Sequence, residues 1–426
     1  MVTDNVSRTV LDNGLTVLIK EMHHAPVASF WVFYRVGSRN EAPGITGISH
    51  WTEHMMFKGT PTFPNTMLDR AISRVGGQWN ASTSFDFTTY FETMPAGEID
   101  LGLQIESDRM VNAIFDPKEV ALERTVIISE RQGAENSPVF LLSEEVRAAA
   151  FRVHPYHHTV IGDMADLQNI SRDDLYTHYR RHYTPNNAIA VAVGEVDGNA
   201  MLARISELFG GLEAGPEPRP IHRAEPEQKG ERRLSIEGEG DTAYLLLAYR
   251  APNAIDPDFF PLSVLDSVLL GAGGASLLGG GGGNRSSRLY KALVETELAA
   301  SVGGGLTPML DPTLYTISAT LRANRTLAEL EAALDAEIER LLVNRPVTEE
   351  ELAKAIKRAQ AAFAYSSESV TNQGFWLGFS ELAANSYTWF QEYLDNLHKV
   401  TVEDVARVAE KYLDRRRRTV GRYVVN

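Results

Sequence analysis

The chain contains two similar halves joined by a polar segment, and this duplication limits the folds that it can adopt. Residues 213–230, EAGPEPRPIHRAEPEQKG, are rich in Pro, Glu and Gly and have almost no aliphatic side chains, which is typical of a linker. The segment Phe30–Arg35 (FWVFYR), which precedes a polar turn and a helical pattern, returns about 215 residues later as Tyr244–Arg250 (YLLLAYR). Because repeated patterns at a fixed spacing indicate diverged copies, we predict domains 1–212 and 231–426.

Each half also ends with the same pattern, a capped helix followed by an apolar strand. The first copy runs from Ser171 into the strand 188–193, and the second runs from Thr401 into the strand 419–424. Strands of mixed order, separated by long helical patterns such as 327–343, are typical of α+β folds. A chain of 426 residues with 43% hydrophobic content can fill two cores. We predict two homologous α/β domains, each a mixed sheet with helices packed on one face.

A metal-ligand motif lies in the first half. The sequence HWTEH at 50–54 has the form H-x-x-E-H, inside a helical pattern that spans 46–58. Histidines four residues apart lie on one helical face, so His50 and His54 can bind one ion. Glu53 projects to the same side, where a carboxylate can take a proton from a metal-bound water. This combination indicates zinc-peptidase chemistry; partly buried histidines without a metal are the alternative.

Two other histidine pairs share the four-residue spacing but enclose no acid. Two arginines separate His178 from His182 and would repel a dication, so we interpret that pair as a solvated helix face. A proline lies between His154 and His158, which predicts a loop. The first pair is therefore the candidate metal site.

The second half lacks the motif. Three aliphatic residues stand about 215 residues after the histidines and the glutamate: Leu265, Val268 and Leu269. These side chains bind no metal, so we expect this helix to pack in a core and the metal site to occur once per chain, in the domain 1–212.

A catalytic zinc usually has a third protein ligand beside water, and the first half offers two acids for this role. Glu123 and Glu130 lie seven residues apart on a helical pattern, so both can face one neighbour. A solvated acidic helix face is the alternative reading. The chain contains no cysteine, so a metal must be held by His and carboxylate side chains. The spacing leaves the choice between the two glutamates open.

Composition excludes several classes of function. A net charge of −15 argues against nucleic acid as the main partner and favours basic or neutral ligands. No apolar run approaches the roughly 20 residues that span a bilayer, so we expect no membrane span. Met1–Asn5 lacks the basic and apolar regions of an export signal, which predicts a cytoplasmic location, with a periplasmic one as the alternative if a signal peptide has been removed. We interpret the run Arg415–Arg418 as a solvated strand edge or a domain contact.

Four segments of the chain carry a family resemblance: HWTEHMMFKGT at 50–60, NAST at 80–83, LERTVIISE at 122–130 and HPYHHTVIG at 154–162. Together they resemble the pitrilysin/insulinase family of inverted-motif zinc peptidases, especially its short two-domain members related to the mitochondrial processing peptidase β subunit. The likeness spans most of both halves.

The resemblance implies a role for each matching residue. It implies Zn²⁺ held by His50, His54 and Glu130, with Glu53 as the general base. It also implies Glu123 as a supporting acid that orients the site. The family pairs an extended substrate with a strand edge by β-augmentation, and the residues that match this edge are Asn80, Ala81 and Ser82.

One segment departs from the family pattern. Members that complete the site supply an Arg and a Tyr from the domain without zinc, and here Val294 and Ala300 stand at those positions, in a segment one residue shorter. Neither side chain can donate a hydrogen bond to a developing oxyanion. The resemblance therefore implies a heterodimer, in which a homologous subunit supplies Arg and Tyr. The glycine-rich segment Gly271–Gly283 is interpreted as a mobile connector, with a flexible flap at the substrate entrance as the alternative.

These observations predict a zinc-dependent endopeptidase that hydrolyses unfolded peptides through a metal-bound water. We expect the chain to be the catalytic subunit of a two-subunit enzyme. The alternatives are a structural subunit without activity and a peptidase that processes one dedicated precursor.

Overall fold

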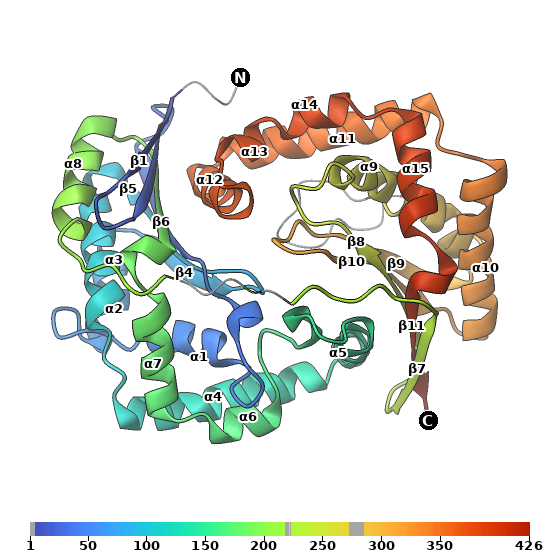
Figure 1. Cartoon of the computed structure of the whole chain (residues 1–426), viewed down its shortest axis with the longest axis horizontal. Helices are drawn as coiled ribbons and strands as arrows, with labels where there is room; N and C mark the ends of the chain where they lie inside the picture. The colour runs from blue at the N-terminus through green and yellow to red at the C-terminus, as the bar shows by residue number, and fades with distance from the viewer. Residues whose placement is uncertain (1–4, 218–220, 222, 272–284) are drawn as a thin grey trace. The chain divides into compact units, whose positions relative to one another are not determined.

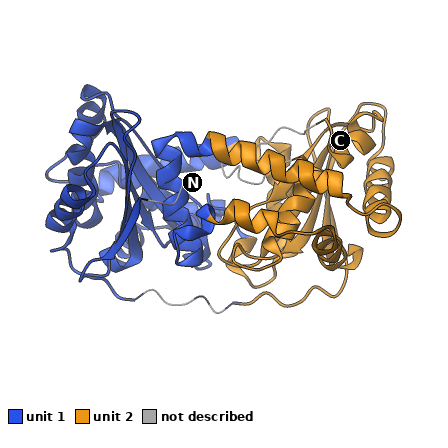
Figure 2. Ribbon diagram, turned by 90° about the horizontal axis from the view of Figure 1, so that it is seen from above, with its two compact units in different colours: residues 1–133, 158–223, 366–391 blue, residues 134–157, 224–365, 392–426 orange. Residues whose placement is uncertain are grey.

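The chain folds into two compact units, each built around its own sheet. The computed structural model describes residues 5–217, 221, 223–271 and 285–426, and Figure 1 labels the elements. Figure 2 colours the units: unit 1 comprises residues 1–133, 158–223 and 366–391, and unit 2 comprises residues 134–157, 224–365 and 392–426. Among the described residues, no helix is both long and apolar enough to cross a membrane. The glycine-rich segment after Gly271 lies outside the described residues.

The sheet of unit 1 has six strands. In spatial order they are β1 (Val6–Val10), β2 (Thr16–Glu21), β6 (Ala188–Gly194), β3 (Val27–Tyr34), β5 (Thr88–Pro95) and β4 (Gln78–Thr83). Strands β2 and β6 pair in parallel, and every other neighbouring pair is antiparallel. The sheet is therefore mixed, with β4 at one edge.

The sheet of unit 2 repeats this arrangement without the first strand. Its spatial order is β7 (Arg232–Gly238), β11 (Arg418–Val425), β8 (Tyr244–Ala251), β10 (Thr313–Leu321) and β9 (Ala299–Leu306). Strands β7 and β11 pair in parallel and the others are antiparallel. The matching order confirms the predicted pair of homologous α/β domains with mixed sheets.

The helices of unit 1 cover both faces of its sheet. They are α1 (Ile48–Met55), α2 (Asn65–Arg74), α3 (Ile99–Asn112), α4 (Pro117–Glu135), α6 (Met164–Asn169), α7 (Arg172–His182), α8 (Gly198–Phe209), α12 (Val370–Ala384) and α13 (Thr388–Gln391). Alternate residues of β3, Phe30 and Val32 among them, enter the main core with Trp51 of α1. Trp31 and Phe33 point to the other face, where their rings lie 5.7 and 5.9 Å from that of Phe375 in α12.

Unit 2 has the same two-faced arrangement. Its helices are α5 (Pro138–Ala150), α9 (Phe259–Leu269), α10 (Leu327–Glu339), α11 (Glu349–Glu368, continuing to the unit boundary), α14 (Tyr393–His398) and α15 (Val402–Tyr412). Strand β11 shows the two faces clearly: Arg422 pairs with Glu331 of α10 on one side, and on the other a Cβ added at Gly421 would strike Val146 of α5. The prediction of helices on one face therefore misses α5 and α12.

The compact units depart from the division drawn at 213–230, because α5 of the first half belongs to unit 2, and α12 and α13 of the second half belong to unit 1. Helix α5 precedes that segment yet packs in unit 2, and α12 follows it yet packs in unit 1. Glycines at the contact let side chains of the neighbouring element lie directly against the backbone. A Cβ added at Gly374 or Gly378 would collide with the rings of Trp31 and Phe33, and Gly421 makes room for α5 in the same way. Such contacts between distant segments leave no local signal in the sequence.

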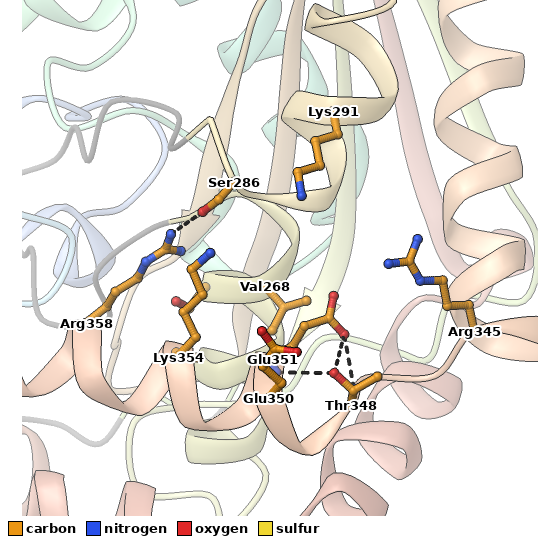
Figure 3. A pocket seen from close by; sticks show the side chains of 11 residues that line it. Val268, Ser286, Lys291, Arg345, Thr348, Glu350, Glu351, Lys354 and Arg358 are labelled. Atoms are coloured by element: carbon orange, nitrogen blue, oxygen red, sulfur yellow. Dashed lines mark hydrogen bonds between the residues drawn. The ribbon is translucent and has the colours of Figure 1, made fainter.

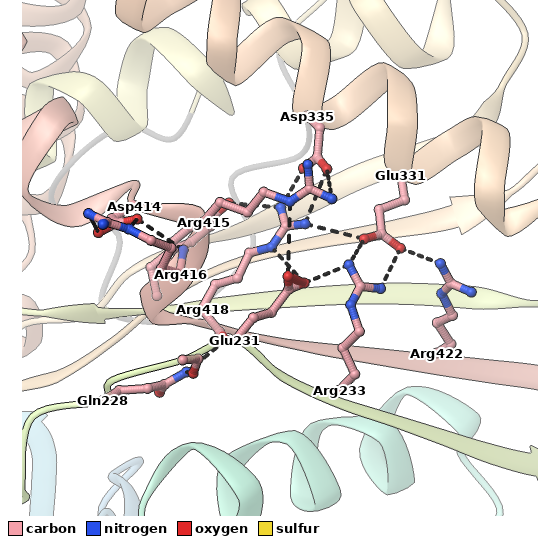
Figure 4. A network of polar contacts seen from close by, with 12 residues as sticks. Gln228, Glu231, Arg233, Glu331, Asp335, Asp414, Arg415, Arg416, Arg418 and Arg422 are labelled. Carbon is pink, nitrogen blue, oxygen red and sulfur yellow. Dashed lines mark hydrogen bonds and ion pairs between the residues drawn. The ribbon is translucent and has the colours of Figure 1, made fainter.

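The arginine run at the start of β11 is partly buried. Arg418 is 1% exposed and pairs with Glu331 at 3.2 Å and Asp335 at 3.1 Å. Figure 4 shows Arg233 and Arg422 converging on the same Glu331. Strand β11 lies between β7 and β8, so the interpretation of the run as a solvated strand edge is wrong for Arg418. Its guanidinium instead links β11 to α10 through ion pairs.

Candidate metal centre

Helix α1 places the two motif histidines side by side. Their ring centroids are 4.6 Å apart, as expected for residues separated by one helical turn. The opposite face of the helix is buried through Trp51 and Met55. The helix begins after Gly47, whose φ of +87° and contact with the backbone of residue 161 favour glycine there.

A buried carboxylate holds the first turn of this helix. Glu41 accepts hydrogen bonds from the backbone N–H groups of Gly47 and Ser49, both at 2.8 Å. His158 Nε2 lies 3.1 Å from the same carboxylate. A negative charge at a helix N-terminus satisfies unpaired N–H groups and stabilises the helix dipole. Glu41 therefore fixes the start of the helix that carries the motif.

Glu130 of α4 approaches both histidines. Its Oε2 atom lies 4.0 Å from His50 Nε2 and 3.7 Å from His54 Nε2. One ligand atom from each of these residues falls within 4.8 Å of the other two, and in the described part of the chain this is the group of three or more such residues that could hold a metal ion. Two imidazoles and one carboxylate form a donor set typical of catalytic zinc.

The surroundings of His50 and His54 shift their pKa values in opposite directions. Burial, together with the neighbouring His54, lowers the pKa of His50 to about 4, so its imidazole is neutral at pH 7 as a ligand must be. Burial also lowers the pKa of His54, but the hydrogen bond to Glu123 and the charge of Glu130 raise it more. His54 Nδ1 lies 2.8 Å from Glu123 Oε1, which leaves Nε2 for a metal. A carboxylate on the far nitrogen of a histidine is the usual support of a zinc ligand.

The structure distinguishes the two glutamates that the spacing leaves open. Glu130 is half-exposed and faces the Nε2 atoms, whereas Glu123 is buried behind His54 and also pairs with Lys58. Burial alone would raise the pKa of Glu123, yet the hydrogen bonds from His54 and Lys58 lower it. Glu123 is therefore an ionised acceptor for His54 and lies outside the ligand group.

Glu53 lies beside the histidines in a buried position. It is 8% exposed, and Thr83 Oγ1 at the end of β4 donates a hydrogen bond of 2.5 Å to Glu53 Oε2. Burial raises the pKa of Glu53, while the bond from Thr83 opposes this effect. A carboxylate with a raised pKa accepts a proton more readily, as a general base at neutral pH requires.

The predicted substrate residues lie on an edge strand. Asn80, Ala81 and Ser82 belong to β4, which pairs with β5 at the margin of the sheet. The N–H of Ala81 donates to the Asn80 side chain at 2.9 Å rather than to a strand. Such an edge exposes backbone groups to which an extended peptide can add.

In unit 2 the positions that correspond to the motif are core positions. Leu265, Val268 and Leu269 are at most 7% exposed on α9, in agreement with the expected packing of this helix. Val294 ends the π-helical turn η5 (Tyr290–Val294), and Ala300 lies on β9. Neither position offers a side-chain donor.

Sequence reasoning missed several residues that support the site. His178 is 7% exposed, and its Nε2 lies 3.4 Å from Ser49 Oγ, so the interpretation as a solvated helix face is wrong because α7 packs against α1. His154 and His158 are also buried around a short 3₁₀ helix, although a loop was expected. No local sequence pattern indicates that Glu41 pairs with His158, because the two residues are 117 positions apart.

Comparison with known proteins agrees with this geometry. Residues 16–164 match the family described as Insulinase (Peptidase family M16), and residues 169–359 match the Peptidase M16 inactive domain. The chain is 31% identical over 410 residues to the zinc protease PqqE of Helicobacter pylori, covering 94% of this chain and 89% of that protein. It is 27% identical over 414 residues to the mitochondrial-processing peptidase subunit beta of Lentinula edodes, covering 95% and 87%.

A solved structure extends the likeness to the fold. The crystal structure of a protease from Helicobacter pylori superposes with a TM-score of 0.92 at 28% identity, over 99% of both chains. The chain therefore belongs to the peptidase M16 (insulinase) family, as a member of its two-domain type.

Proposed function

We propose that the chain is a zinc-dependent endopeptidase that hydrolyses unfolded peptides. The observation that carries the proposal is the convergence of His50, His54 and Glu130, with the buried Glu53 on the same helix. Relatives over nearly the whole length are named zinc proteases, which supports the same activity. A structural subunit would have no need for three aligned ligands beside a buried acid.

Each residue of the site has a distinct role in this proposal. When bound by His50, His54 and Glu130, zinc would lower the pKa of a coordinated water to about 7. Glu53 would take the proton and later deliver it to the leaving amine. Thr83 donates to Glu53 Oε2 and so orients the other carboxylate oxygen, while Glu123 orients His54.

Two substitutions separate metal binding from catalysis. Glu130→Gln should weaken zinc retention by at least the roughly 10–100-fold that the loss of a supporting residue costs. Glu53→Gln should retain zinc and lose nearly all peptide cleavage. Zinc content measured by atomic emission, together with cleavage of an unfolded peptide, tests both. Unchanged zinc in the first variant would remove Glu130 from the ligands, and an active second variant would exclude Glu53 as the base.

The edge strand β4 suggests how the peptide is held. An added strand would hydrogen-bond to the backbone of Asn80, Ala81 and Ser82. Ala81→Pro removes an N–H that faces away from β5 and should raise KM, while Ala81→Val should preserve binding because it keeps the N–H. Equal KM values for the two variants would argue against strand addition at this residue.

We further propose that the chain works as the catalytic subunit of a heterodimer. Val294 and Ala300 supply no donor where the family has Arg and Tyr, so a homologous subunit would bring both. The relative from Lentinula edodes is itself named as a subunit of a processing peptidase, which also keeps a dedicated precursor as a candidate substrate.

The isolated chain provides the test of the heterodimer. It should bind zinc and peptide but cleave slowly, because losing one oxyanion donor costs about 10²–10³ in rate. Adding the partner should restore the rate at equal zinc loading. Full activity of the isolated chain would overturn the two-subunit proposal, and a zinc-free chain that stays inactive with its partner would favour the structural alternative.

A further inference from the structure

Unit 2 contains a pocket whose walls carry four cationic side chains. Its volume is about 280 Å³, and it lies between the end of α9, the turn η5 and the first turns of α11. Figure 3 shows the cations around it: Lys291, Arg345, Lys354 and Arg358. Lys354 and Arg358 are one turn apart on α11, so both face the same space. A chain with a net charge of −15 has gathered positive charge at this place.

Most of this positive charge is not neutralised. In the part of the chain that the structure describes, no ion pair is found for the side chains of Lys291, Arg345 and Lys354. The acid Glu351 is already occupied, because it pairs with Arg288 at 2.6 Å and accepts from the N–H of Thr348 at 3.1 Å. Glu350 is the other acid of the lining. The excess of cations makes the pocket attractive to anions.

A buried hydroxyl in the lining also lacks a partner. Ser267 at the end of α9 is 4% exposed, and its Oγ is buried without a hydrogen-bond partner. It lines the pocket together with the hydroxyl-bearing residues Ser286 and Thr348. Buried polar atoms are rarely left unpaired in folded proteins. An acceptor that fills the pocket would complete the hydrogen bonding of Ser267.

We propose that this pocket binds a small, multiply charged oxyanion of the diphosphate class. Arginine guanidinium groups bind phosphate oxygens through paired N–H donors, and lysine acts as a point charge on them. The pocket is at the small end of the range for ligand sites, so it suits pyrophosphate or the diphosphate group of a larger molecule. The site belongs to unit 2 and needs none of the zinc ligands, so it stands independently of the proposed peptidase activity.

Calorimetric titration of the full chain with pyrophosphate and with adenosine diphosphate tests the proposal. We expect saturable binding at one site in physiological salt. Lys291→Ala and Lys354→Ala should each weaken it about tenfold, as expected for the loss of one charge-assisted hydrogen bond. Ser267→Ala should also weaken binding while preserving the melting temperature, since alanine suits a helix. Equal affinity for the two ligands would assign the site to the diphosphate group alone, and tighter binding of the nucleotide would assign it to a nucleoside diphosphate.

The matched control is Lys357→Ala. Lys357 is an exposed cation on the same helix but does not line the pocket, so its loss should leave the affinity unchanged. An equal effect of Lys357→Ala and Lys354→Ala would show that the binding depends on nonspecific charge, and it would overturn the proposal. Absence of saturable binding at millimolar ligand would overturn it too, as would binding of a glutamate-rich peptide in place of both phosphates.

Discussion

Glu123→Gln should weaken zinc binding without removing a ligand. In the wild type, Glu123 Oε1 lies 2.8 Å from His54 Nδ1, and its other oxygen pairs with Lys58. Glutamine has nearly the same shape but is a neutral acceptor, and hydrogen bonds to an ionised acceptor are roughly twice as strong as neutral ones. His54 would then be a weaker and less well oriented ligand. Changes of this kind cost about 10–100-fold in metal affinity, or about 1.4–2.7 kcal/mol.

The assay is a competition titration of zinc against a chelating dye at neutral pH. Glu119→Gln is the matched control, because Glu119 lies one turn earlier on α4 and 3.9 Å from Lys58 but has no contact with His54. The control should retain the zinc affinity of the wild type. Unfolding of the metal-free proteins separates a loss of fold from a loss of affinity. Unchanged affinity in Glu123→Gln, or an equal loss in Glu119→Gln, would refute the role of Glu123 as the support of His54.

Three further predictions concern stability. Glu41→Ala should lower the free energy of unfolding by about 3–5 kcal/mol, because it leaves buried donors without their charged partner, whereas the exposed Glu98→Ala should change little in chemical denaturation. Gly378→Ala should destabilise the chain by about 1–3 kcal/mol through its collision with Phe33, while Gly133→Ala, with open space around it on α4, should stabilise it by about 0.5–1 kcal/mol; a gain in both would contradict close packing of α12. Burial raises the pKa of Asp266 from 3.8 to about 7, so the folded state binds this proton more tightly than the unfolded state and stability falls as pH rises through that window. Asparagine carries no titrating proton, so Asp266→Asn should remove this pH-dependent fall in the free energy of unfolding, which is up to the order of 4 kcal/mol. If urea unfolding gave the two proteins the same dependence of this free energy on pH, the prediction would be contradicted.

Local patterns in the sequence predicted the strands and the duplication of the chain. They did not predict which sheet each helix packs against. The strands β3 and β8 follow from apolar runs, and the similarity of the two halves follows from their spacing. The exchange of α5 and α12 between the units depends on Gly374, Gly378 and Gly421, where a missing side chain lets a helix approach a sheet. Isolated glycines occur throughout the chain for other reasons, so no sequence pattern identifies those that serve this contact.

In the candidate site, too, the sequence predicts contacts within one helix but not contacts between distant segments. One helical turn places His50 beside His54, which the spacing predicts without any knowledge of the fold. Helical spacing also places Glu123 and Glu130 on one face, but it does not say which of them reaches the metal position. The family resemblance implies Glu130 as the ligand, and in the structure Glu130 lies within 4.0 Å of the Nε2 atoms of both histidines. Neither the helical spacing nor the family resemblance identifies Glu41, which accepts hydrogen bonds from the first turn of the motif helix.

The two copies differ in the side chains that surround α1 in unit 1 and the corresponding helix α9 in unit 2. In unit 1 this helix presents Glu53 and two histidines, and Glu130 faces them from α4. In unit 2 the position of Glu53 is Val268, which lines the cationic pocket together with Lys291 and Lys354. The basic side chains of that pocket would repel a metal cation. Restoring the H-x-x-E-H motif to α9 alone should therefore create no zinc site, because the buried helix would face positive charge.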